Sequence, residues 1–177
     1  MNYLQQDAIT AGDCRKVHDC LQGLDRLQNF NTKPTAILFA ACTCGNPEIS
    51  SLIAGKHSWF DFCSQYSVTK SYPLHEAALR HNTEFFEILS QDPVFKEKYT
   101  SDRKFTSMKD GEGNTLLHIA ADKQAINIIK FSLEFGLDPL VKNFKGVTPL
   151  HFAAMRGSEV IAKLLLESDK VHESNLT

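Results

Sequence analysis

The most constraining feature of this sequence is a short motif that recurs along the chain. Residues 146–154 read GVTPLHFAA, and residues 113–121, lying 33 residues earlier, read GNTLLHIAA. Residues 72–78, YPLHEAA, form a third copy, and residues 35–41, TAILFAA, form a weaker fourth. From the first copy to the last, the spacings are 37, 43 and 33 residues. A motif repeated at such intervals indicates a solenoid, in which each unit buries its apolar side chains against its neighbours.

Each copy predicts a pair of short helices. In the last copy Pro149 follows Thr148 and suits the first helical position, where its missing N–H costs nothing. Gly157 suits the left-handed residue that ends a helix. The next helix has one apolar stripe at helical spacing, made by Val160, Ile161, Leu164 and Leu165. In the copy before it, Gln124 stands in the place of Gly157, so we expect a weaker helix end there.

The motif, its period and the helix-pair pattern together resemble the ankyrin-repeat family, whose unit is 33 residues with a T-P-L-H-x-A signature. The resemblance covers roughly residues 1–167. It implies an all-α solenoid of helix-turn-helix units joined by β-hairpin-like loops. It also implies that the motif histidines His75, His118 and His151 tie their repeats together by hydrogen bonds near the helix start.

The repeat spacing leads us to expect one domain over residues 1–167. An atypical N-terminal cap repeat is expected over residues 1–29 and a second repeat over 30–66. A repeat with an insertion follows over 67–109, then a repeat over 110–142 and the last repeat over 143–167. A polar tail over residues 168–177 is expected to fray.

Two connections are longer than the repeat requires. The first carries four aromatic residues, Trp59, Phe60, Phe62 and Tyr66. We expect them to pack against the stack, and the alternative is an aromatic contact patch. The second, residues 91–109, holds Phe95 and Tyr99 four residues apart, which predicts an extra helical turn against the stack.

Composition excludes several classes of function. The net charge of −2 gives no general attraction to nucleic acid or to anionic membranes, and no apolar run approaches a membrane span of ~18 residues. The N-terminus lacks the pattern of a signal peptide, and the five cysteines, an odd number, favour free thiols. We therefore expect a cytoplasmic protein, a monomer that binds neither nucleic acid nor membrane.

The sequence contains two tempting chemical motifs. His75-Glu76 resembles the start of H-E-x-x-H, but Leu79 occupies the place of the second histidine. Cys42 and Cys44 are too close together for a structural zinc pair. We predict no catalytic residue, no cofactor and no metal; a cysteine-based metal or catalytic site within residues 14–63 is the less favoured alternative.

The resemblance also implies where a partner would bind, since the family binds proteins through hairpin tips and through inner-helix positions after the alanine pair. Transferred to this chain, those inner-helix positions are Cys42, Thr43, Leu79, Arg80, Asp122, Lys123, Met155 and Arg156. The hairpin tips are Glu112, Asn114, Phe144, Lys145 and Val147. Apolar anchors beside arginine and lysine favour an acidic-hydrophobic segment of a protein partner, bound in the concave groove.

The expected function is therefore that of a non-catalytic protein-protein interaction module, acting as an adaptor, an inhibitor or a recruiting domain. A second hypothesis is a recruiting segment of a larger ankyrin-containing protein, such as a bacterial effector delivered into host cells. In that case the location would be the host-cell cytoplasm.

Overall fold

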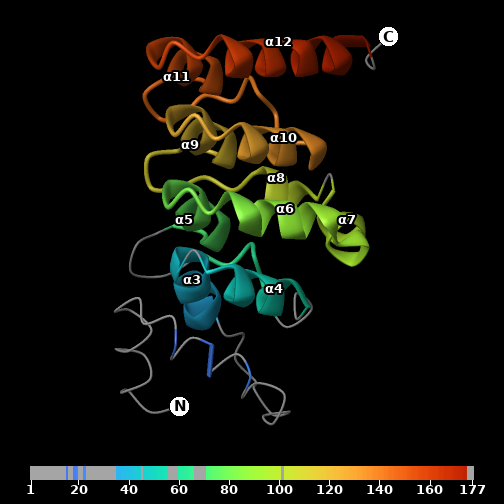
Figure 1. The fold of residues 1–177 in the computed structure, drawn as a ribbon. Helices are drawn as coiled ribbons and strands as arrows, with labels where there is room; N and C mark the ends of the chain where they lie inside the picture. Colours follow the sequence, from blue (N-terminus) through green and yellow to red (C-terminus); the bar gives the residue numbers. More distant parts are fainter. Residues whose placement is uncertain are drawn as a thin grey trace.

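Helix pairs stacked one upon another make up the fold (Figure 1). The computed structural model describes residues 15, 18–19, 22, 35–44, 46–55, 60–65, 71–100 and 102–174. The regular elements in these residues are all helices, which confirms the all-α solenoid. The N-terminal cap expected over residues 1–29 lies almost wholly outside the described residues.

Within the described residues, four helix pairs follow the repeated motif. They are α3 (Thr35–Cys44) with α4 (Pro47–Gly55), α5 (Pro73–Leu79) with α6 (Thr83–Gln91), α9 (Leu116–Asp122) with α10 (Ile126–Glu134), and α11 (Pro149–Met155) with α12 (Glu159–Ser174). The first helices of the pairs form one layer and the second helices another (Figure 1). We call the side formed by the ends of α5, α9 and α11 and by the loops 110–115 and 143–148 the inner-helix face.

The core lies between the two layers. Leu74 and Leu117 of the motif are fully buried, as are Phe85 and Ile128 at matching positions of the second helices. Because each pair covers the previous one, the apolar stripe of every unit is removed from water by its neighbours.

The insertion of residues 91–109 forms two further helices, α7 (Pro93–Tyr99) and α8 (Arg103–Thr106). Asp92 starts α7 by accepting hydrogen bonds from the backbone N–H groups of Val94 and Phe95 at 2.9 and 3.0 Å. Asp102 starts α8 in the same way through the N–H of Phe105 at 2.8 Å. The extra helical turn expected at Phe95 and Tyr99 is confirmed.

Aromatic side chains join this insertion to the earlier long connection. The ring of Phe62 lies edge-on to the ring of Phe95, with centroids 5.2 Å apart, and 6.0 Å from the ring of Tyr99. Phe60 is also buried, so the expected packing against the stack is confirmed for both phenylalanines. Trp59 and Tyr66 lie outside the described residues. We call Phe62, Phe95, Tyr99, Phe105, Phe131 and Phe135 the aromatic cluster.

The last helix extends beyond the expected repeat end. α12 continues to Ser174 rather than stopping near Glu167, because nothing between residues 159 and 174 is a glycine or a proline that would break a helix. The backbone of the expected polar tail is therefore helical up to Ser174.

The motif helices end on a left-handed residue, and this leads to a prediction. The φ angles are 67° at Gly157, 56° at Gln124 and 58° at His81. A non-glycine residue is strained at such an angle, so Gln124→Gly should raise the free energy of unfolding by about 0.5 kcal/mol after the entropy cost of glycine. Urea denaturation would measure it. The reverse change, Gly157→Gln, should lower the free energy of unfolding. A Gln124→Gly variant less stable than the unchanged chain, or a Gly157→Gln variant more stable than it, would contradict the strain argument.

A second prediction concerns the motif alanines. Ala77, Ala120 and Ala153 are fully buried, whereas Ala154 is exposed. Ala153→Leu should overpack this contact and cost roughly 1–3 kcal/mol, measurable as a lower melting temperature. Ala154→Leu is the matched control and should change stability little. If both variants melted like the unchanged chain, our register for this repeat would be wrong.

Candidate functional site

The inner-helix positions expected to bind a partner come together at the ends of three successive helices. Leu79, Asp122 and Met155 are the last residues of α5, α9 and α11, and the next residues along the chain are Arg80, Lys123 and Arg156. Met155 is 76% exposed and Leu79 43%, both high values for apolar side chains. The position transferred to Cys42 is wrong, because that residue is fully buried and cannot contact a partner.

The two hairpin tips lie beside each other on the same face. The backbone N–H of Phe144 donates to the carbonyl oxygen of Glu112 at 3.1 Å, which links the tips of consecutive repeats. The side chain of Phe144 is 74% exposed, although one edge lies so close to Gly113 that a Cβ on that glycine would sit 2.7 Å from the ring. Phe144 and Met155 therefore give this face its two most exposed large apolar side chains.

Asn114 and Val147 contribute to the hairpins themselves. The amide of Asn114 donates to Asp110 Oδ2 at 3.1 Å and accepts from Asn143 Nδ2 at 2.8 Å. Val147 is half-buried, and its backbone N–H donates to Asn143 Oδ1 at 3.0 Å. Both residues hold the loops in shape, so their side chains are less available to a partner than the sequence suggests.

Most of the basic side chains on this face are paired within the chain. Arg80 Nε lies 3.1 Å from Glu76 Oε1, and Lys145 Nζ lies 3.0 Å from Glu112 Oε2. Two guanidinium nitrogens of Arg156, Nε and Nη2, donate to Asp122 Oδ1 at 3.0 and 2.6 Å. Lys123 is the remaining cation among these positions, and no carboxylate of the described residues forms an ion pair with it.

The motif histidines have the structural role that the resemblance implies. Nδ1 of His118 accepts from the backbone N–H of Thr115 at 3.0 Å, so the proton must sit on Nε2, which donates to the carbonyl oxygen of Val147 at 3.0 Å. His151 repeats the contact with the N–H of Thr148 at 3.2 Å. The bond between the imidazole Nδ1 and the threonine N–H ties a repeat together. The bond from His118 Nε2 to Val147, which the sequence did not suggest, ties that repeat to the next one.

His75 makes the bond to the next repeat but not the bond within its own repeat. Its Nε2 donates to the carbonyl oxygen of Asn114 at 3.2 Å, but Nδ1 is buried without a hydrogen-bond partner among the described residues. The cause is in the sequence, since Tyr72 replaces the motif threonine and brings a ring, 5.4 Å away between centroids, in place of a hydroxyl. Burial lowers the pKa of His75 to about 4, and burial also lowers the pKa of His118.

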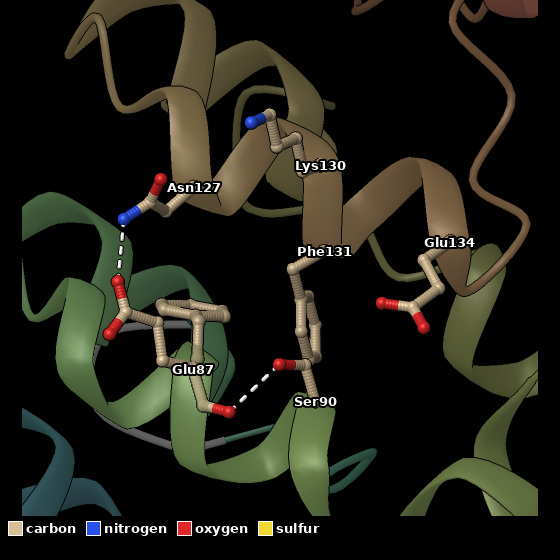
Figure 2. A pocket seen from close by; sticks show the side chains of 7 residues that line it. Glu87, Ser90, Asn127, Lys130, Phe131 and Glu134 are labelled. Atoms are coloured by element: carbon tan, nitrogen blue, oxygen red, sulfur yellow. Dashed lines mark hydrogen bonds between the residues drawn. The ribbon is translucent and has the colours of Figure 1, made fainter.

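The opposite side of the stack carries a hollow that sequence reasoning missed. It has a volume of about 190 Å³ and lies between α6 and α10 (Figure 2). Asn127 Nδ2 donates to Glu87 Oε1 across it at 2.6 Å, and Glu134 Oε1 pairs with Lys96 Nζ at 2.6 Å. The two phenylalanines beneath it, Phe86 and Phe131, are buried. Its walls come from two different repeats, so no local sequence signal marks it.

The described residues also bear on the chemical alternatives. No group of three or more histidine, cysteine or acidic side chains is close enough to hold a metal ion in the parts of the chain searched. Cys42 and Cys63 are buried thiols, and burial raises the pKa of Cys63 to about 11, which disfavours the reactive thiolate. Likewise, none of the helices described is long and apolar enough to cross a membrane.

Comparison with known proteins places these observations in a wider context. A family model described as ankyrin repeats (3 copies) matches residues 74–175, more than half of the chain. Part of the chain is 34% identical over 94 residues to the human transient receptor potential cation channel subfamily A member 1, covering 53% of this chain and 8% of that protein.

Two further relatives show the same pattern of partial coverage. The mouse protein phosphatase 1 regulatory subunit 12A is 38% identical over 56 residues, which is 32% of this chain and 5% of that protein. A putative ankyrin repeat protein of Rickettsia felis is 32% identical over 91 residues, which is 47% of this chain and 40% of that protein. The chain thus matches less than half the length of each of these relatives.

Proposed function

The chain belongs to the ankyrin-repeat family, and from that premise we propose that it is a non-catalytic module that binds a protein partner through its inner-helix face. The observation that carries the proposal is the exposure of Phe144 and Met155, 74% and 76%, on the face where the repeats present their hairpin tips and helix ends. Exposed apolar side chains that share one face, as Phe144 and Met155 do, are more typical of an interaction site than exposed apolar residues scattered singly.

The broader context supports a binding role. Repeat families of this kind are generally protein-protein interaction modules, and one relative is a regulatory subunit by name. The role of adaptor, inhibitor or recruiting domain, a cytoplasmic location and a monomeric state are parts of the same proposal. Since the chain spans so small a share of its relatives, a recruiting segment of a larger ankyrin-containing protein is the second candidate.

Site-specific cross-linking tests which face binds. A photo-reactive amino acid at Met155 should capture a protein from lysate, because this exposed position lies on the inner-helix face. The matched control places the same group at Lys130, an exposed residue on the opposite side of the stack beside the hollow (Figure 2). Capture from Lys130 alone, or equal capture from both positions, would contradict the proposed face.

Removing the two apolar anchors gives a quantitative prediction. The double variant Phe144→Ala/Met155→Ala should bind the captured protein at least about tenfold more weakly, because a few exposed anchors carry most of the energy of an interface. Its melting temperature should stay nearly unchanged, since both side chains face water. Val94→Ala is the control, because Val94 is also an exposed apolar residue but lies on α7. Unchanged affinity of the double variant, measured by titration calorimetry, would exclude these residues from the site.

A further inference from the structure

The basic residues on the inner-helix face have structural reasons to be where they are. Arg80, Lys123 and Arg156 each occupy the C-cap position of a motif helix, where a positive charge interacts favourably with the helix dipole. The pair between Arg156 and Asp122 joins α11 to α9, and the pair between Lys145 and Glu112 joins two hairpins. These cations are therefore accounted for without any acidic partner.

The same pairs reduce what an acidic partner could gain. A carboxylate from outside would either displace Asp122 from Arg156, or Glu112 from Lys145, or share a cation whose charge that acidic group already neutralises, and it would then be repelled by that group. Exchange of one exposed ion pair for another brings little net affinity. Lys123 is different, since it faces no carboxylate in the described part of the chain and can accept one at no such cost.

The exposed apolar residues Phe144 and Met155, in contrast, have no pairing among the described residues that a partner would have to replace. The ring of Phe144 lies against Gly113 on one edge, and its backbone is held by the bond to Glu112, so part of its conformational freedom is lost before a partner arrives. Less conformational entropy remains to be lost there on binding. Met155, at the end of the next inner helix, adds a flexible side chain that adapts to the shape of what it contacts.

Building on the proposed function, we infer that the partner presents a predominantly apolar segment, which contacts Phe144 and Met155 and places a single carboxylate near Lys123, rather than a strongly acidic segment. This narrows the acidic-hydrophobic segment expected from the sequence. The apolar part of that expectation is kept, and the acidic part is reduced to one charge.

A peptide library tests this inference. Random twelve-residue peptides displayed on phage would be selected against the full chain, with Phe144→Ala/Met155→Ala as the counter-target. The enriched peptides should be rich in aromatic and aliphatic residues, and the affinity of the synthetic peptides should change less than about threefold between 50 and 500 mM NaCl, since at most one ion pair is screened.

Charge variants provide the second arm. Arg80→Gln/Arg156→Gln should weaken the binding of the selected peptides less than threefold, whereas Lys123→Glu should weaken the binding of the peptides that carry a carboxylate more than threefold. Two outcomes would overturn the inference and leave the proposed function standing. One is enrichment of peptides dominated by aspartate and glutamate, and the other is a tenfold or greater loss of peptide affinity in the arginine double variant or in high salt. Failure to enrich any peptide over the counter-target would count against both.

Discussion

Replacing Phe95 with alanine should destabilise the chain by about 3–5 kcal/mol, the usual cost of removing a buried aromatic ring. Phe95 is fully buried at the centre of the aromatic cluster. Its ring centroid lies 4.6 Å from that of Tyr99, 5.2 Å from that of Phe62 and 5.5 Å from that of Phe135. The ring thus holds together two long connections and the second helix of a neighbouring repeat, and urea denaturation would measure its contribution.

Val94→Ala is the matched control for this change. Val94 precedes Phe95 on α7 but is 53% exposed, so its loss should cost no more than about 0.5 kcal/mol. A cost below about 1 kcal/mol for Phe95→Ala, within the range of surface changes, would mean that the insertion is an appendage and not part of the core.

Lowering the pH from 6.5 to 4 should remove roughly 3 kcal/mol of stability through His75 alone, since each unit of pKa difference is worth 1.36 kcal/mol. The direction follows from the depressed pKa of the folded state. Between pH 6.5 and 4 the unfolded chain binds a proton that the folded chain does not, so the stability is fully present above pH 6.5 and is lost as the pH falls. The physical cause is the buried Nδ1, which has no acceptor for a proton among the described residues.

Two measurements check this effect. Proton NMR should show the His75 ring titrating near pH 4 in the folded chain, where the negative charge of Asp110 only partly offsets the burial. His75→Gln should flatten the decline of stability over this pH range, and the slope that remains should include a contribution from His118, whose pKa is also lowered. A His75 ring that titrates near 6.5, or an unaltered slope in the variant, would show that the imidazole is hydrated.

Local patterns predicted most of the backbone. Pro149 as the first residue of α11 and the left-handed Gly157 after it are short-range features, and both are found in the structure. Gln124 also adopts the left-handed conformation. The repeat geometry overrides the preference of an individual residue there, because the packed neighbours on both sides hold the helix end in place.

The candidate site was harder to predict, because its chemistry depends on long-range partners. The sequence shows Arg156 and Lys145 as free cations, but their carboxylates lie about one repeat away, at Asp122 and Glu112. Asn114 resembles an exposed tip residue until its bonds to Asp110 and Asn143 are seen. Spacing along the chain indicates which residues share a face and leaves their hydrogen-bond partners undetermined.

What the sequence determined by itself is the repeating helix pair with its buried alanines and leucines, since periodicity and short-range capping are properties of consecutive residues. The structural role of the histidines was expected from the family resemblance. The tertiary structure decided how the two long connections pack through Phe62 and Phe95, why Nδ1 of His75 has no partner, and which charges neutralise each other. These depend on residues brought together from different repeats, and such contacts are set by the stacking of whole units rather than by any local pattern.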